Sequence, residues 1–585
     1  MCGIAGMMTA NGALPPAAAI AAMLDAMAHR GPDGHGRYEA PGIALAQARL
    51  AIIDLATGDQ PLFGPSGSVL VANGEIYNYV ELRKDFAGVN FATQGDCELP
   101  LYTYARDGAR FAHDLRGMYG IGLHAGDANY LVRDPFGIKP LYYAETAQGL
   151  VFASEPQAIL KTGLVERRIR DEAANELLQL QFTTGRATIF AGITRVLPGE
   201  TIAVANGVPG ARHVEPALPD GPLLDLSEDE ALARLNAALM NSVMVHQRSD
   251  VPYGLFYSGG IDSTAILACM AKLNDRPVRC FTARFPETSK SGEAGHALAL
   301  AKAAGADARE VTVTAEKFWT RLPAIARAMD DPASDYAIVP TYMLAEEAGR
   351  EMKVVLCGEG GDELFGGYGR YRSVLRPAWL GGRKLRSRGF LDGYDVLRDA
   401  SAAWRRGIAA AGHQPAAHDR LQAAQAQDCA DWLPHDLLLK LDRCLMAHSL
   451  EGRTPMLDPV VADLAYRLPV KFKIRRGLGK YLLRKWLERT MPAARPFAPK
   501  RGFTVPVDEW IAARAEKLAP LVARQEGVAA VCYPEAVERL FRSYSGGDRR
   551  RGIACWQLLF YALWHRIHAE GVDASGDVFA CLEAA

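Results

Sequence analysis

The sequence predicts an α/β protein built from two separately folded parts. A chain of 585 residues is too long for one hydrophobic core. After residue 250, short apolar segments alternate with helical ones, which is typical of a doubly wound parallel sheet with helices on both faces. Before residue 205, apolar residues alternate around 70–72 and 121–123 as they do in strands. We expect a first domain at 1–205, a linker rich in Gly, Pro and Ala at 206–230, and a second domain at 231–585.

The composition excludes several classes of protein. Apolar residues make up 49% of the chain, charged residues make up 23%, and the formal net charge is −1, as in a soluble globular protein. This balance gives no electrostatic reason to expect a nucleic-acid or acidic membrane partner. No apolar run approaches the roughly 20 residues of a membrane helix. The start of the chain lacks the pattern of a signal peptide. The ten cysteines are scattered without a C-x-x-C pair, so we expect a reduced protein in the cytoplasm.

The turn at 258–263, with the sequence S-G-G-I-D-S, joins a predicted strand at 253–257 to a predicted helix at 263–273. A strand-to-helix turn directs free backbone N–H groups and the positive end of the helix dipole at one point, which suits a phosphate group. Gly259 and Gly260 let a ligand approach the backbone, and Ser258 and Ser263 add hydroxyl groups. The Asp262 carboxylate fits beside a phosphate if a divalent cation lies between the two groups.

A second glycine-rich loop follows a predicted strand at 353–357. In this loop, glycines separate the carboxylates of Glu359, Asp362 and Glu363, so backbone and acidic side chains can share a small space. The carboxyl ends of parallel strands meet at one edge of a sheet, and we expect both loops there. The other predicted strands are 278–281 and 310–313, and the other predicted helices are 294–304, 318–329 and 340–349.

Cys2 is the candidate nucleophile of the first domain. Its small size permits removal of Met1, which would leave Cys2 with a free α-amine next to its thiol. Such an amine can act as the general base that activates a terminal nucleophile. The alternative is that Cys2 is a small residue beside an edge strand at 3–5.

The motifs that follow Cys2 favour the catalytic interpretation. In their order they resemble the glutaminase domain of the N-terminal-nucleophile glutamine amidotransferases, which implies a layered α/β/β/α fold. The motifs are M-C-G-I-A-G at 1–6, H-R-G-P-D-G at 29–34, R-L-A-I-I-D at 49–54, N-G-E-I-Y-N at 73–78, G-D-C-E at 95–98, R-D-P-F-G at 133–137, K-P-L-Y at 139–142 and F-A-S-E at 152–155.

The resemblance implies a role for each matched residue. Cys2 would attack the glutamine amide, and the Asn73 side chain and Gly74 N–H would stabilise the oxyanion. Arg49 suits the α-carboxylate of glutamine, whereas Glu75 and Asp96 suit its ammonium. We interpret His29 as structural. The remaining implied glutamine contacts are Leu50, Ala51, Ile52 and Ile53.

The turn at 258–263 resembles the pyrophosphate loop of ATP pyrophosphatases, and together with the second loop it resembles the synthetase domain of the asparagine synthetase family. This implies that Asp262 and Asp362 hold Mg²⁺ on the pyrophosphate of ATP and that Glu359 supports formation of an acyl-adenylate. Lys480 resembles the lysine that contacts the phosphates, and E-G-R-T-P-M-L-D at 451–458 also matches the family. The expected adenine contacts are Phe256, Ala283, Cys357 and Gly358.

These resemblances predict that glutamine supplies ammonia and ATP activates a carboxylic acid. Aspartate is the leading acceptor. A peptide, sugar or natural-product carboxylate is the alternative, because the region 330–340 differs from the sequence most common in asparagine synthetases. Asp335 and Tyr336 lie there and could recognise either acceptor. A non-catalytic sensor of glutamine or ATP is the third hypothesis. The expected partners are these small molecules, with no nucleic acid or membrane, and a homodimer is left open.

Two other regions carry less information. Residues 376–430 are rich in Ala and Arg and match no motif. The chain after Arg495 contains P-K-R-G-F at 499–503, followed by Trp510, Trp556 and Trp564, which we expect to lie in the core.

Overall fold

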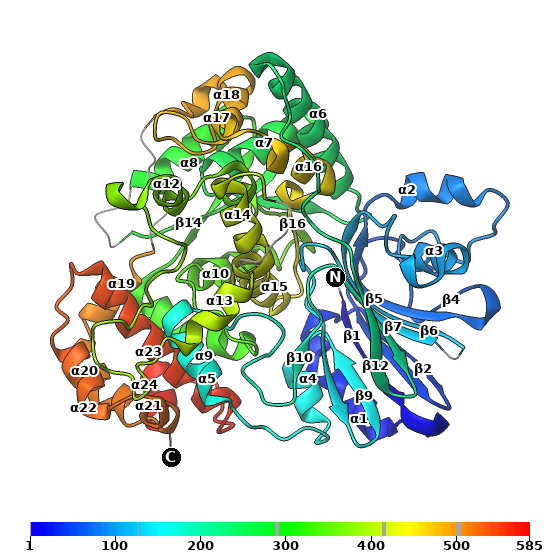
Figure 1. Cartoon of the computed structure of the whole chain (residues 1–585), viewed down its shortest axis with the longest axis horizontal. Helices are drawn as coiled ribbons and strands as arrows, with labels where there is room; N and C mark the ends of the chain where they lie inside the picture. Colours follow the sequence, from blue (N-terminus) through cyan, green and yellow to red (C-terminus); the bar gives the residue numbers. More distant parts are fainter. Residues whose placement is uncertain (1, 127, 287–291, 412–416, 499–504, 585) are drawn as a thin grey trace.

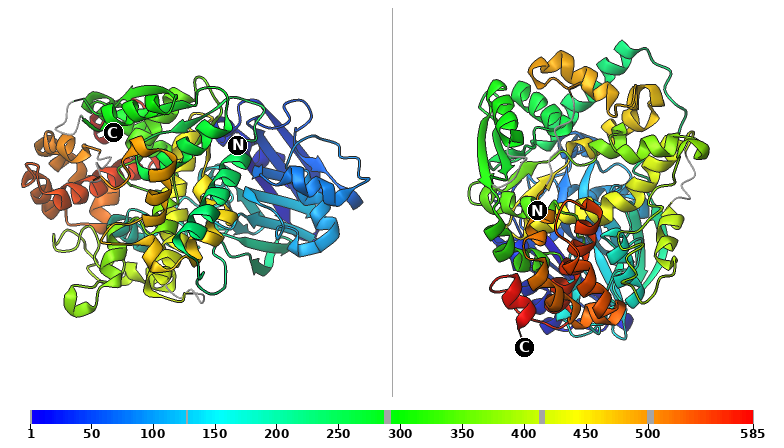
Figure 2. Two further views of the ribbon diagram at one scale, coloured as in Figure 1. Left: turned by 90° about the horizontal axis from the view of Figure 1, so that it is seen from above. Right: turned by 90° about the vertical axis from the view of Figure 1, so that its left-hand side faces the viewer.

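The computed structural model describes residues 2–126, 128–286, 292–411, 417–498 and 505–584. The first domain and the second lie side by side, and the start of the chain is at their junction (Figures 1 and 2). All ten cysteines are free thiols and are buried. Among the described residues, we find no helix that is long and apolar enough to cross a membrane.

The first domain is a sandwich of two six-stranded antiparallel sheets, with strand orders β10-β8-β9-β1-β3-β2 and β12-β11-β7-β6-β5-β4. Apolar side chains from both sheets fill the space between them, among them Ile4, Leu45, Val71 and Phe152. The strands are β1 Gly3–Thr9, β2 Gly34–Ala40, β3 Ile43–Arg49, β4 Leu62–Phe63, β5 Val69–Ile76, β6 Gly117–Ala125, β7 Ala128–Arg133, β8 Tyr142–Thr146, β9 Gly149–Ala153, β10 Thr194–Arg195, β11 Glu200–Ala205 and β12 Val208–Val214.

Helices cover both outer faces of this sandwich (Figure 1). Ile20 and Met23 of α1 pack with apolar residues of β1 and β3, whereas Leu99 and Leu101 of α3 pack on the other sheet. The predicted α/β/β/α layering is therefore confirmed. The helices are α1 Ala17–Ala26, α2 Tyr79–Leu82, α3 Leu99–Asp107, α4 Pro156–Lys161 and α5 Asp171–Leu180.

The second domain contains a five-stranded parallel sheet of order β15-β14-β13-β16-β17, which confirms the predicted α/β class. The first four strands match predicted segments: β13 Tyr253–Phe256, β14 Arg279–Arg284, β15 Asp307–Thr312 and β16 Val354–Leu356. The fifth, β17 Glu451–Arg453, was not predicted as a strand because its sequence, E-G-R, contains no apolar side chain. The helices around the sheet are α6 Glu228–His246, α7 Ile261–Leu273, α8 Gly292–Ala303, α9 Ala315–Ala328, α10 Ile338–Ala348, α11 Gly361–Phe365, α16 Pro459–Arg467, α17 Val470–Lys473 and α18 Tyr481–Thr490.

The segment between the domains starts inside a hairpin. β12, at 208–214, pairs with β11 at the edge of the second sheet, so the irregular connector begins after it. α6 then starts at a capping box, in which the Ser227 side chain accepts from the Glu230 N–H and the Glu230 carboxylate accepts from the Ser227 N–H. The domain boundary at 206–230 stays our proposal.

The region without motifs, 376–430, follows α12 Gly369–Leu375 and contains α13 Arg406–Ala411 and α14 Arg420–Gln427. A π-helix at Asp428–Leu437 then leads directly into α15 Leu438–Met446. The C-terminal helices are α19 Val507–Ala512, α20 Ala515–Ala523, α21 Glu526–Val531, α22 Pro534–Arg542, α23 Arg549–His568 and α24 Val578–Glu583. Trp510, Trp556 and Trp564 are buried in the core there, as predicted. The stretch 499–503 lies outside the described residues.

Candidate active sites

A small pocket of about 40 Å³ in the first domain contains most of the predicted glutamine site. It lies between the loop after β3 and the residues around β5. Of the predicted residues, those that line it are Cys2, Arg49, Leu50, Ile52, Ile53, Gly74, Glu75 and Asp96. Lining residues without a prediction are Gln47, Gly58, Gln60, Leu62, Thr93, Gly95 and Cys97.

Cys2 lines this pocket, and the Asn73 side chain holds its backbone. The backbone N–H of Cys2 donates to Asn73 Oδ1 at 3.0 Å. Asn73 is fully buried, and its Nδ2 has no hydrogen-bond partner among the described residues. This buried donor is therefore available to an oxygen bound near Cys2. Burial raises the pKa of the Cys2 thiol, so the thiol needs a base before it can attack. Met1 lies outside the described residues.

The charged groups of the pocket are arranged for a zwitterion. Arg49 Nη1 donates to Asp59 Oδ1 at 2.8 Å, and Nη2 donates to the Asp54 carbonyl at 2.6 Å. The Asp59 side chain is 83% exposed, so an incoming carboxylate can replace this partner. Among the acidic residues of the lining, burial raises the pKa values of Glu75 and Asp96, and a ligand ammonium beside them would favour their charged forms.

Two predicted residues of this site lie outside the pocket lining. Ala51 instead connects to its surroundings by its backbone: its N–H donates to Asp33 Oδ2 at 2.7 Å, and Lys353 Nζ donates to its carbonyl at 3.4 Å. Asn73 lies behind the lining, where its side chain contacts Cys2. His29 lies 3.2 Å from Glu155 Oε1, at the domain interface.

The second cavity, of about 270 Å³, lies beyond the carboxyl ends of β13 and β16 and confirms that the two glycine-rich loops meet. A Cβ atom on Gly361 would lie 2.3 Å from Asp262 Oδ1, so the loops are in close contact. A Cβ on Gly360, which has a φ of +89°, would lie 2.2 Å from Leu457. A side chain on Gly361 would therefore displace the Asp262 carboxylate, and one on Gly360 would be strained and would displace Leu457. Predicted residues in the lining are Phe256, Ser258, Asp262, Ser263, Ala283, Cys357, Gly358, Glu359 and Asp362.

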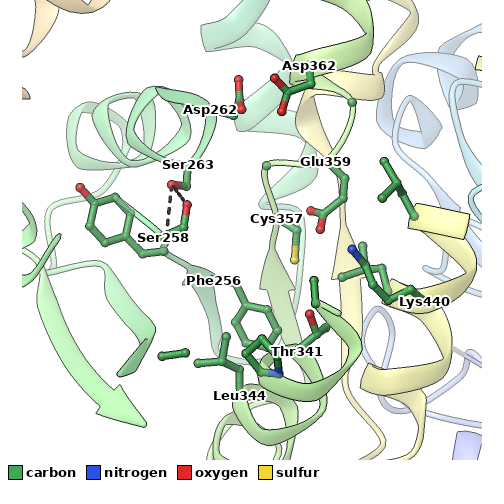
Figure 3. A pocket seen from close by; sticks show the side chains of 18 of the residues that line it. Phe256, Ser258, Asp262, Ser263, Thr341, Leu344, Cys357, Glu359, Asp362 and Lys440 are labelled. Atoms are coloured by element: carbon green, nitrogen blue, oxygen red, sulfur yellow. Dashed lines mark hydrogen bonds between the residues drawn. The ribbon is translucent and has the colours of Figure 1, made fainter. Parts of the chain in front are cut away.

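Charged side chains gather at one end of this cavity. Figure 3 shows the carboxylates of Asp262 and Asp362 close together, away from Phe256 and Leu344 at the apolar end. Lys480 forms ion pairs with both carboxylates, at 2.7 Å to Asp362 Oδ1. Although burial opposes its charge, these carboxylates raise the pKa of Lys480. The two carboxylates offer the oxygen ligands that Mg²⁺ prefers, and the ammonium beside them can bind phosphate oxygens, so this end of the cavity fits an ATP–Mg²⁺ phosphate site. Gly259, Gly260 and Lys480 border the site without belonging to the cavity lining.

A second group of charges surrounds Lys440, on the side of the cavity away from the loop at 258–263 (Figure 3). Lys440 Nζ donates to Asp335 Oδ2 at 3.1 Å. Burial raises the pKa of Glu359, while Lys440 opposes that rise. The sequence did not predict Lys440. The signal was present, because a lysine in the apolar run L-L-L-K-L at 437–441 must find a buried partner.

A buried network of charges joins the two domains between the two cavities. Arg453 Nη2 lies 3.2 Å from Glu75 Oε1 in the glutamine pocket, and the Arg453 carbonyl accepts from the Cys357 N–H at 2.8 Å. Its Nε donates to Glu451 Oε1 at 2.6 Å. Burial opposes ionisation of Glu451, but Arg453 helps to lower its pKa to about 2. One residue of β17 thus contacts both cavities.

Comparison with known proteins gives two matches along the chain. Residues 1–212 match the family model of a glutamine amidotransferase domain, and residues 234–566 match that of asparagine synthase. A putative glutamine-hydrolysing asparagine synthetase of Mycobacterium tuberculosis is 36% identical, with 97% of this chain and 98% of that protein covered. Asparagine synthetase 1 of Bacillus subtilis is 30% identical, with 97% of each chain covered. An amidase of Penicillium rubens is 31% identical over 60% of this chain and 55% of its own. The chain therefore belongs to the asparagine synthase family and joins a glutamine amidotransferase domain to a synthase domain of a type that uses ATP.

Proposed function

We propose that the protein is a glutamine-dependent asparagine synthetase, which converts aspartate, ATP and glutamine into asparagine, AMP, pyrophosphate and glutamate. The observation that carries this proposal is that Arg453 contacts Glu75 in the lining of the Cys2 pocket and Cys357 in the lining of the cavity of the two glycine-rich loops. An ammonia-producing site and an acid-activating site serve one reaction only if their products can meet.

The glutaminase step uses Cys2 and its neighbours. Once Met1 is removed, the α-amine of Cys2 takes the thiol proton, and the thiolate attacks the carboxamide carbon of glutamine. The oxyanion then accepts hydrogen bonds from Asn73 Nδ2 and the Gly74 N–H. Collapse of this intermediate releases ammonia and leaves a thioester, which water hydrolyses to glutamate and the free thiol.

The synthetase step takes place in the second cavity. The adenine lies at the apolar end near Phe256 and Leu344, and the phosphates lie along the turn at 258–263. The side-chain carboxylate of aspartate attacks the α-phosphorus, pyrophosphate leaves towards Lys480, and ammonia later displaces AMP from the adenylate. Asp262 and Asp362 would hold Mg²⁺, which offsets the charge of the pyrophosphate when bound.

Ammonia must reach the adenylate without entering water, where most of it would become ammonium. The interface offers a water-poor region for this transfer, since Arg30, Glu155, Glu451 and Arg453 are all at most 5% exposed there. We propose that the passage runs between the two cavities through this interface.

Aspartate is the proposed acceptor because Lys440 and Asp335 place a positive and a negative group together beside the cavity. A free amino acid needs both. The second candidate is an amidotransferase for another carboxylate, which the similarity to an amidase over 60% of the chain favours.

The test is pyrophosphate release in the presence of ATP, Mg²⁺ and ammonium across a panel of acids. We expect aspartate to give the highest kcat/KM. Release with another acid and none with aspartate would establish the second candidate. If none of the acids supported release, both candidates would be contradicted.

A further inference from the structure

A second carboxylate lies beside Lys440 on the helix that borders the nucleotide cavity. Leu437 and Lys440 line this cavity, at the junction of the π-helix and α15. Asp436 precedes Lys440 by four residues, a spacing at which an aspartate and a lysine on a helix can form an ion pair. Burial opposes the charge on this lysine, but the carboxylates of Asp335, Glu359 and Asp436 raise its pKa, so all three lie close enough to interact with it.

Asp436 is enclosed by the protein and yet has no hydrogen-bond partner. Its side chain is fully buried, and both of its carboxylate oxygens are unpartnered among the described residues. The nearby guanidinium groups of Arg370 and Arg386 donate to Asp428 instead, at 2.8 and 2.5 Å. Burial, together with the carboxylate of Asp335, raises the pKa of Asp436. Because an unpartnered buried carboxylate is costly, we expect Asp436 to gain a cation in another state of the protein.

Lys440 is the cation within reach, and in this structure it is paired with Asp335. Lys440 Nζ donates to Asp335 Oδ2 at 3.1 Å, and the Ala337 N–H donates to Asp335 Oδ1 at 3.2 Å. Both oxygens of Asp335 are therefore engaged, although its side chain is 27% exposed. Ala337 and Pro340, which follow Asp335 in the chain, line the cavity, so this carboxylate lies beside the space for the acceptor.

The ammonium group of an amino-acid acceptor would compete with Lys440 for Asp335. Two ammonium groups on one carboxylate repel each other, so the acceptor binds well only if Lys440 can move away. Asp436 offers Lys440 the other partner, four residues earlier on the same helix. After this exchange, each of the two carboxylates has one ammonium group, and no buried charge is left without a partner.

We propose that Asp436 is a positioning residue for acceptor specificity, which takes Lys440 from Asp335 when an acid that carries an ammonium group enters the cavity. The inference rests on the proposed function, because it assigns the recognition of the acceptor amine there. An acid without an amine leaves the pair of Lys440 and Asp335 in place and gains nothing from Asp436. The exchange therefore favours aspartate over succinate, which is aspartate without its amine.

The test compares these two acids with the full-length protein. The KM for aspartate is measured by pyrophosphate release with ATP, Mg²⁺ and ammonium, and succinate is measured as a competitive inhibitor of the same reaction. We expect Asp436→Asn to raise the KM for aspartate about 10–100-fold, as the loss of a bond to a charged group does. The inhibition constant of succinate and the kcat should stay within about twofold of the wild type. A parallel rise of both constants, or an unchanged KM for aspartate, would overturn the inference.

Two further variants make the result specific. Asp463→Asn is the matched control and should change neither constant, since this side chain on α16 is 54% exposed and lines neither cavity. If Asp436→Asn does not fold, Asp436→Leu fills the space without a charge, and the same selective rise is expected.

The wild type separates this inference from the proposed function. Absence of pyrophosphate release with aspartate would contradict the proposed acceptor, and the comparison would then use the accepted acid and its amine-free analogue. Normal release with aspartate and an unchanged KM in Asp436→Asn would overturn the inference alone. An acceptor that carries no amine would overturn it as well.

Discussion

The two cavities of this protein are built in different ways. The glutamine pocket is small, about 40 Å³, and is enclosed by strands of a sandwich and the loops that join them. The nucleotide cavity has about 270 Å³ and is formed by loops and helices beyond the ends of a parallel sheet. A strand framework fixes one small ligand, whereas loops beyond a sheet admit ligands of different size. We therefore expect strict selection of glutamine and a choice of acceptor that depends on residues around Lys440.

The strongest test of this difference is the removal of the nucleophile. Cys2→Ala should lower glutamine-dependent synthesis by at least about a thousandfold, as the loss of a nucleophile does in other enzymes. Synthesis from ammonium should stay within about twofold of the wild type, because the second cavity is intact. The two activities are measured as the rate of product formation with glutamine and with ammonium as the nitrogen source.

Cys581→Ala is the control, since this thiol lies on α24 and lines neither cavity. An equal loss with ammonium and glutamine in Cys2→Ala would show that the two cavities are not separate catalytic sites.

The next largest effect is expected at the phosphate end of the second cavity. Asp362→Asn removes one of the two carboxylates that contact Lys480 and should weaken the response to Mg²⁺ about a hundredfold. Exchange of labelled pyrophosphate into ATP over a range of Mg²⁺ concentrations measures this change. Basal glutamine hydrolysis should be unaffected. A normal Mg²⁺ requirement in the variant would contradict the assignment of the metal site.

The structure brings the predicted residues of each site together, and the sequence could indicate this grouping for a physical reason. Cys2, Asn73, Asp262 and Asp362 sit in short motifs whose chemistry depends on neighbours in the chain, such as a glycine beside a carboxylate. The four-layered α/β/β/α order of the first domain and the parallel sheet of the second also follow from local periodicity and the motif resemblance, and both are confirmed.

The interface could not be predicted in this way. The pairs Arg30–Asp442 and Glu75–Arg453 join residues more than 370 positions apart, and nothing local distinguishes them from solvated charges. The sequence gives one hint only: Lys440, Asp442 and Arg443 interrupt an apolar helix, and buried charges require partners.

A smaller effect is expected at the carboxylate end of the glutamine pocket. Arg49→Lys cannot make two parallel bonds to a carboxylate and should raise the KM for glutamine about 10–100-fold, since bonds to charged groups contribute roughly 1.5–3 kcal/mol. The kcat with ammonium should not change. Arg37→Lys, on β2 with a side chain that is 43% exposed, is the matched control. An unchanged KM for glutamine in Arg49→Lys would remove this residue from the site.

The smallest effect concerns pH. Burial raises the pKa of the Cys2 thiol, so its thiolate fraction should increase with pH beyond about 8.5, the value of an ordinary cysteine. Alkylation of Cys2 by iodoacetamide, followed on the N-terminal peptide, should rise by up to about tenfold per pH unit there. The alkylation rate of free cysteine levels off above the pKa of free cysteine and provides the reference. A plateau below pH 8 would contradict the raised pKa.

The central claim is that nitrogen passes from the first cavity to the second inside the protein. Glutamine labelled with ¹⁵N in its amide, supplied together with an excess of unlabelled ammonium, tests this claim directly. The account predicts that the amide of the product carries mostly ¹⁵N. A product whose label is diluted to the ratio in solution would show that ammonia leaves the protein before it reacts.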